Sequence, residues 1–146
     1  MNRRIQIMIL CLAWVAVLFP GDALPDEVKL SSYDDQRPQS LLVSNAQICE
    51  GVNDQVPVNP TVALSAAKGK AFCFSEIDGI TSSTVIFHNW LRRDVHTVRV
   101  KLAVNPPRWS TFSSISLQDA DRGPWRVEIT DMDGTMLKTL RFSVVD

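Results

Sequence analysis

Residues 125–144, WRVEITDMDGTMLKTLRFSV, decide the fold because they contain two β-strand patterns joined by a tight turn. Apolar residues alternate with polar ones in both halves, first at Trp125, Val127 and Ile129 and then at Leu140, Phe142 and Val144. A period of two is typical of a strand with one buried and one wet face. Between the halves, Asp133-Gly134 supplies the positive φ angles that a tight hairpin needs. The stretch therefore predicts two neighbouring antiparallel strands.

Short strand patterns also occupy much of the preceding chain. We expect strands at 46–52, 70–77, 84–91 and 98–104, with a weaker candidate at 110–117, and a helical turn only within 61–70. About seven short strands within roughly 100 residues are typical of a Greek-key sandwich. The sequence thus predicts an all-β, immunoglobulin-like antiparallel β-sandwich over residues 45–146. Its predicted core includes Trp90, Trp125, Val127, Ile129 and Phe142.

The N-terminal region has the features of an export signal. Arg3 and Arg4 precede an uncharged apolar run at 7–19, and small residues stand before a cleavage position after Ala23. We expect a signal peptide at 1–23, an acidic polar linker at 24–44, and a periplasmic or secreted protein. The alternative is an uncleaved inner-membrane anchor formed by 7–19, although this run is shorter than the roughly 20 residues that span a bilayer.

The overall charge bears on the class of partner. The chain has 15 Lys and Arg against 16 Asp and Glu, a net charge of −1. A nucleic-acid binder needs a concentrated basic surface, so we expect no nucleic-acid partner. The sequence contains no phosphate-binding loop, dinucleotide fingerprint, nucleophile elbow or HExxH motif, and we expect no cofactor.

Cys49 and Cys73 lie outside the predicted signal peptide, on two different strand candidates. In an oxidising compartment such a pair predicts a disulfide, which would stabilise the fold by roughly 3 kcal/mol on the chain-entropy model. The alternative is a pair of buried free thiols. Two distant thiolates without a third ligand nearby form no standard zinc site, so no metal is expected.

Two histidines are the candidate catalytic residues. His88 lies within a predicted strand and His96 near the next turn, but no nucleophile stands at a recognisable spacing from either. We therefore expect no catalytic residue and no enzyme activity. The alternative is a metal-dependent or hydrolytic enzyme that uses His88 and His96. The Asp131-x-Asp133-Gly134 string resembles the start of a calcium loop, but a hairpin turn explains it better, since further ligands of that loop are missing.

Trp109 is the tryptophan most suited to a binding surface. It follows Pro106-Pro107-Arg108 at a junction between a loop and a strand, where an aromatic ring can be exposed for stacking. Basic residues at Arg92, Arg93 and Arg108 could gather beside it. These four residues form the predicted binding surface.

Several ordered motifs resemble the bacterial domain of unknown function numbered 2914. They are KAFCFSEI from Lys70, His88-Asn89-Trp90, VRVKLAV, WSTFSS from Trp109, GPWRV from Gly123, and Asp133-Gly134 followed by Leu137 and Phe142-Ser143-Val144. The resemblance covers nearly all of residues 45–146 and implies an exported or membrane-attached domain with no established activity. The chain departs from the family at Ser110 and Ile115, where basic residues are usual.

Export, a sandwich fold and the lack of a catalytic motif together predict a non-catalytic interaction module of the cell envelope. Its expected partner is an envelope protein or a polysaccharide, bound through one sheet face and its loops. A purely structural spacer domain is a further alternative. Membrane attachment is expected only if the signal segment stays uncleaved.

Overall fold

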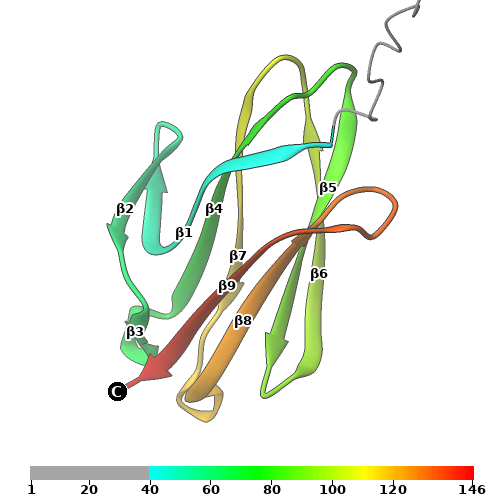
Figure 1. Ribbon diagram of the computed structural model, residues 1–146. Helices are drawn as coiled ribbons and strands as arrows, with labels where there is room; N and C mark the ends of the chain where they lie inside the picture. Colours follow the sequence, from blue (N-terminus) through cyan, green and yellow to red (C-terminus); the bar gives the residue numbers. More distant parts are fainter. Residues whose placement is uncertain (1–39) are drawn as a thin grey trace, which may run out of the picture. The chain divides into compact units, whose positions relative to one another are not determined.

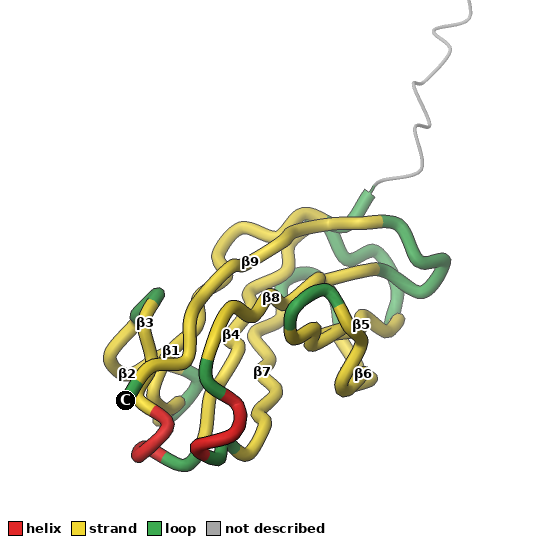
Figure 2. Tube along the Cα trace, turned by 90° about the horizontal axis from the view of Figure 1, so that it is seen from below, coloured by secondary structure: helices red, strands yellow, loops and turns green. Residues whose placement is uncertain are grey.

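The computed structural model describes residues 40–146, in which nine strands and two short 3-10 turns follow one another. The predicted signal peptide and most of the predicted linker lie outside the described residues. The strands are β1 (Leu42–Asn53), β2 (Val56–Pro60), β3 (Ala63–Ser65), β4 (Lys70–Asp78), β5 (Thr84–Arg92), β6 (Val95–Val104), β7 (Trp109–Ser116), β8 (Gly123–Thr130) and β9 (Met136–Val145). The 3-10 turns are η1 (Ala66–Lys68) and η2 (Asp119–Asp121), which lie at the same end as the C-terminus (Figure 2).

Two sheets form the sandwich. Sheet A has the strand order β2-β1-β4-β7, and sheet B has the order β3-β9-β8-β5-β6 (Figure 1). All neighbouring strands are antiparallel except β3 and β9, which run parallel. The structure thus confirms the predicted all-β sandwich, with nine strands in place of about seven. None of the helical turns in residues 40–146 is long and apolar enough to cross a membrane.

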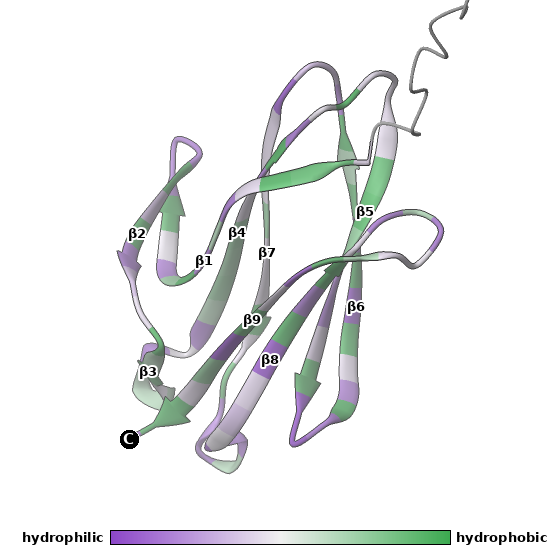
Figure 3. Ribbon diagram, in the orientation of Figure 1, coloured by the Kyte–Doolittle hydropathy of each residue, from purple (hydrophilic) through white to green (hydrophobic). Residues whose placement is uncertain are grey.

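The β8–β9 hairpin forms as its sequence predicts. Trp125 pairs with Phe142 and Val127 with Leu140, so the two apolar series share one face of sheet B. Alternating apolar and polar bands along β6 and β8 are visible in Figure 3. At the turn, Gly134 has a φ of 86°, and the Asp131 carboxylate accepts hydrogen bonds from the backbone N–H groups of Asp133 and Thr135. This carboxylate closes the turn.

The core lies between the two sheets. The five residues that the sequence places there are all buried: Trp90, Trp125, Val127, Ile129 and Phe142. The Phe142 ring meets Trp90 edge-on and stacks on Trp125, with ring centroids 6.1 Å and 6.2 Å away. Such aromatic pairs stabilise a core by about 1 kcal/mol beyond the area that they bury.

Three parts of the fold differ from the prediction. β1 begins at Leu42 rather than at residue 46, and its register shifts between Val43 and Asn45, which hides the alternation of apolar residues there. β2 contains two prolines and an Asn59 with positive φ, which sequence patterns assign to a loop. β3 has only three residues and is too short to show a period.

The structure shows no disulfide between Cys49 and Cys73, and both thiols are free and buried. In the β1–β4 pair, Cys49 lies opposite Phe72 and Cys73 lies opposite Ile48. An offset of one residue sends the two side chains to opposite faces of sheet A, since successive residues of a strand alternate. Cys73 packs in the core, and burial raises the pKa of both thiols.

Candidate functional site

The four residues of the predicted binding surface do not form one surface. Thr84 at the start of β5 pairs with Val104, close to Arg108 and Trp109, whereas Arg92 at the end of β5 pairs with Val95. Arg108 and Trp109 therefore lie at one end of the sandwich and Arg92 and Arg93 at the other, as the β6–β7 and β5–β6 connections show in Figure 1. A strand of nine residues spans about 30 Å, so residues that lie near the same strand in the sequence can be at opposite ends of the sandwich.

At the first end, Trp109 is 40% exposed and Arg108 is held by acids of β4. The Arg108 guanidinium binds both carboxylate oxygens of Asp78, with Nη2 2.8 Å from Oδ2, and lies 3.6 Å from Glu76. Arg108 holds the pKa of Asp78 below its usual range, and Asp78 in turn raises the pKa of Arg108. The charge of Arg108 is thus already compensated, which makes it a weak candidate for binding an anion.

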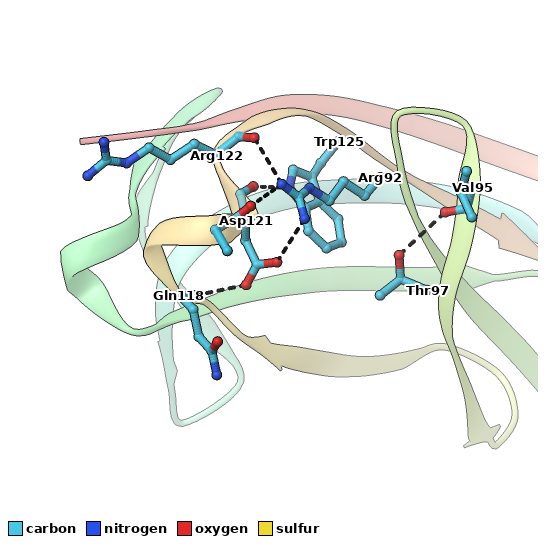
Figure 4. A network of polar contacts seen from close by, with 8 residues as sticks. Arg92, Val95, Thr97, Gln118, Asp121, Arg122 and Trp125 are labelled. Atoms are coloured by element: carbon cyan, nitrogen blue, oxygen red, sulfur yellow. Dashed lines mark hydrogen bonds and ion pairs between the residues drawn. The ribbon is translucent and has the colours of Figure 1, made fainter.

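At the other end, Arg92 fixes the loop between β7 and β8 (Figure 4). Its Nη1 lies 3.3 Å from Oδ1 of Asp121, and its Nη2 donates to the carbonyl oxygens of Ala120 and Arg122. Trp125 Nε1 donates to the carbonyl of Asp121 at 2.7 Å, so the core tryptophan anchors the same loop. Arg92 therefore positions the loop instead of presenting a free charge.

A groove lies under this loop, between the free edges of β6 and β7. It has a volume of about 480 Å³, and we call it the edge groove; its lining is Thr97, Val98, Ser114, Ile115, Ser116, Gln118, Asp121 and Trp125. Strands β6 and β7 end their respective sheets, so within residues 40–146 no neighbouring strand closes the groove. The lining thus combines hydroxyl, amide and carboxylate groups with apolar side chains.

The polar lining of the edge groove is held in place by the loop. Asp121 Oδ2 accepts a hydrogen bond from the Gln118 backbone N–H at 2.8 Å, and its Oδ1 faces Arg92. Trp125 is 4% exposed, so only a small part of its ring reaches the groove. Sequence reasoning missed this site because its residues come from three strands and a loop. The only local signal is the serine-rich pattern of β7, SSIS at 113–116, on an edge strand.

His88 is buried between the sheets and joins them. Its Nε2 lies 3.0 Å from Ser75 Oγ of sheet A and its Nδ1 lies 2.8 Å from Ser113 Oγ, which also accepts a hydrogen bond from Trp90 Nε1 at 3.1 Å. Burial lowers the pKa of His88 to about 4, so the ring is neutral at physiological pH. A neutral ring can donate one bond and accept the other, and both serine contacts are satisfied.

His96 lies apart from this network. It is exposed and pairs with Leu91 beside the β5–β6 turn, whereas His88 is wholly buried three residues earlier on β5. Within residues 40–146, no group of three or more His, Cys, Asp or Glu side chains is arranged to hold a metal ion. The two histidines therefore do not share a pocket, which the enzymatic alternative requires.

The later part of the chain matches a known family. A family model described as "Protein of unknown function (DUF2914)" matches residues 83–144, which run from just before β5 to the end of β9. Residues 83–144 match this family. The match confirms the expected family over a shorter range than residues 45–146. The matched range includes the residues that line the edge groove, together with His88 and His96.

Comparison with other proteins adds little to the family assignment. No curated protein matches the chain. Among solved structures, a selenomethionine-labelled beta-glucosidase from Kluyveromyces marxianus is similar with 12% identity and a TM-score of 0.40. The likeness covers 73% of this chain but only 14% of that enzyme, and at this level it carries no conclusion about activity.

Proposed function

We propose that this protein is a non-catalytic interaction module of the bacterial cell envelope that binds a polysaccharide in the edge groove. The observation that carries the proposal is the lining of that groove, which combines hydroxyl, amide and carboxylate groups with apolar side chains. Sugars present many hydroxyl groups around apolar ring faces. A site with several positioned polar groups and some apolar surface matches that chemistry.

The size and placement of the edge groove support a small ligand segment over a large protein partner. Its volume of about 480 Å³ lies within the usual range of roughly 300–1,000 Å³ for small-molecule sites. A stable protein interface buries about 800 Å² on each partner, often around aromatic anchors. The lining of the groove offers hydroxyl groups, from Thr97, Ser114 and Ser116, instead of such anchors.

The geometry of His88 supports a role without catalysis. A catalytic base must come within about 3 Å of the proton that it removes. The His88 ring is wholly buried, and both of its nitrogens already face serine hydroxyls. Its low pKa is explained by burial alone. The envelope location rests on the predicted signal peptide.

Binding of glycans to the folded protein tests the proposal. We expect an array of envelope polysaccharides to return at least one ligand, and the double variant T97V/S116A to weaken its binding about thirtyfold, since each of the two lost hydrogen bonds contributes about 1 kcal/mol. Ser143→Ala, an exposed hydroxyl on the outer face of sheet B, is the matched control and should leave binding unchanged. If the folded protein binds no glycan, or if all variants bind equally well, the edge groove is not a glycan site.

A further inference from the structure

A second, smaller cavity lies on the outer face of sheet B, beside the β5–β6 turn. Its volume is about 140 Å³, and three arginines line it from three different elements: Arg93, Arg126 and Arg141. The other lining residues are Leu91, Asp94, Pro124 and Trp125. We call it the arginine pocket. Trp125 is the one lining residue that it shares with the edge groove.

The charges in the arginine pocket are unbalanced. Arg126 is paired, because its guanidinium contacts Asp94 and its Nε lies 2.7 Å from Glu128. Arg93 and Arg141 form no ion pair with any residue in the range 40–146. The pocket therefore has an excess of positive charge at neutral pH.

The register of β8 and β9 places two of these charges side by side. Arg126 lies directly opposite Arg141 on the outer face of sheet B. Like charges directly opposite each other in an antiparallel pair destabilise it, since the Cβ atoms are only about 5 Å apart. Asp94 and Glu128 offset the charge of Arg126. This leaves Arg141 as the unpaired member of the two within residues 40–146, and a bound anion would offset the charge of Arg141.

The backbone of Arg93 is fixed beside the pocket. It is the first residue of a two-residue hairpin turn and has a φ of 47°, a region that arginine rarely adopts. Its N–H donates to the Pro124 carbonyl, and its guanidinium lies over Gly123, where an added Cβ would be 3.5 Å from Nε. Gly or Asn is the usual residue in such a turn, so the arginine is kept there at a cost in turn stability.

Part of the lining of the arginine pocket is apolar. Leu91 and Trp125 are buried, at 2% and 4% exposed, and Pro124 is an exposed apolar neighbour. A hydrogen bond to a charged group is stronger where water is partly excluded. Since a water molecule takes about 30 Å³, the cavity has room for about five oxygen-sized groups. This is the size of one tetrahedral or planar oxyanion.

We propose that the arginine pocket binds a single oxyanion group, a phosphate, sulfate or carboxylate, with Arg93 and Arg141 as its principal donors. Guanidinium groups recognise such anions through paired N–H donors. The anion can be free in solution or carried by a larger molecule such as a lipid headgroup. The inference does not depend on glycan binding in the edge groove.

Titration of the protein with sodium phosphate, at constant ionic strength set with sodium chloride, tests the pocket directly. We expect saturable binding, detected by the backbone NMR signals of Arg93, Arg126 and Arg141. Arg141→Gln should weaken the binding about tenfold or more, because it removes one charge-assisted hydrogen bond. Arg93→Gly should do the same while it relaxes the strained turn, so that its loss of binding cannot be attributed to unfolding.

Lys101→Gln is the matched control, because Lys101 lies on the same outer face of sheet B but outside the arginine pocket. It should change phosphate binding less than about twofold, as expected for diffuse screening of exposed charges. A second arm with phosphatidylglycerol vesicles identifies the source of the anion. Vesicle binding that Arg141→Gln abolishes assigns a lipid headgroup, and phosphate binding alone assigns a small free anion. No phosphate binding, or equal losses in Lys101→Gln and Arg141→Gln, would overturn the proposal.

Discussion

The buried His88 should make the stability of the fold depend on pH in a defined window. Its pKa is about 4 in the folded protein and about 6.5 in an unfolded chain. The unfolded chain therefore binds a proton that the folded protein refuses. The stability that this group contributes is fully present above about pH 6.5 and is lost progressively as the pH falls toward 4.

The magnitude follows from linkage. A shift of one pKa unit corresponds to about 1.4 kcal/mol. Between about pH 7.5 and about pH 4.5, the difference between the two pKa values removes about 2.5 kcal/mol from the free energy of unfolding. That is a large part of the roughly 5–15 kcal/mol that stabilises a typical domain. Glu50 and Asp78, whose pKa values are lowered by their partners, lose their contributions at lower pH.

Chemical denaturation at several pH values measures this dependence. We expect the wild-type protein to lose about 2.5 kcal/mol across that window, and His88→Gln to lose less than about 0.5 kcal/mol, because an amide does not titrate. His96→Gln replaces an exposed histidine and should keep the wild-type slope. If the wild type shows no slope between pH 7.5 and 4.5, or if His88→Gln retains the slope, His88 is not the buried neutral ring described above.

Three further changes test the packing. Peptide mapping without reductant should find Cys49 and Cys73 as separate free thiols that react only after unfolding; a peptide that joins them would contradict the β1–β4 register. Trp90→Phe should lower the free energy of unfolding by about 1–2 kcal/mol through loss of the bond to Ser113, measured by denaturation, and no change would mean that this bond contributes nothing. Gly134→Ala should cost about 1 kcal/mol, because φ at this turn is 86°, and a more stable variant would refute the turn geometry.

The parts of the fold that sequence alone predicts are those with an uninterrupted period. In β8 and β9, alternation continues to the Asp133-Gly134 turn, so both the strands and their pairing can be predicted. β2 and the start of β1 could not be predicted in the same way. A bulge at residues 43–45 breaks the alternation in β1, and tertiary pairing with β1 overrides the low strand propensity of the prolines in β2.

Which side chains face each other could not be predicted from residue types alone. The expected compartment and the number of cysteines predict a disulfide between Cys49 and Cys73. The one-residue offset in register instead places their side chains on opposite faces of sheet A. The same limitation applies to the sites. Charge alone groups Arg92 with Arg108, although the topology places them at opposite ends of the sandwich, and the edge groove depends on side chains from distant parts of the chain.

The most direct test of the proposed function is an NMR titration of the folded protein with the best ligand from the glycan array. The indole N–H signal of Trp125, which lines the edge groove, should shift during the titration together with the backbone signals of Thr97 and Ser116. The indole signal of Trp90, bound to Ser113 inside the core, should stay in place. Shifts that cluster instead at Trp109, at the other end of the sandwich, would contradict binding in the edge groove.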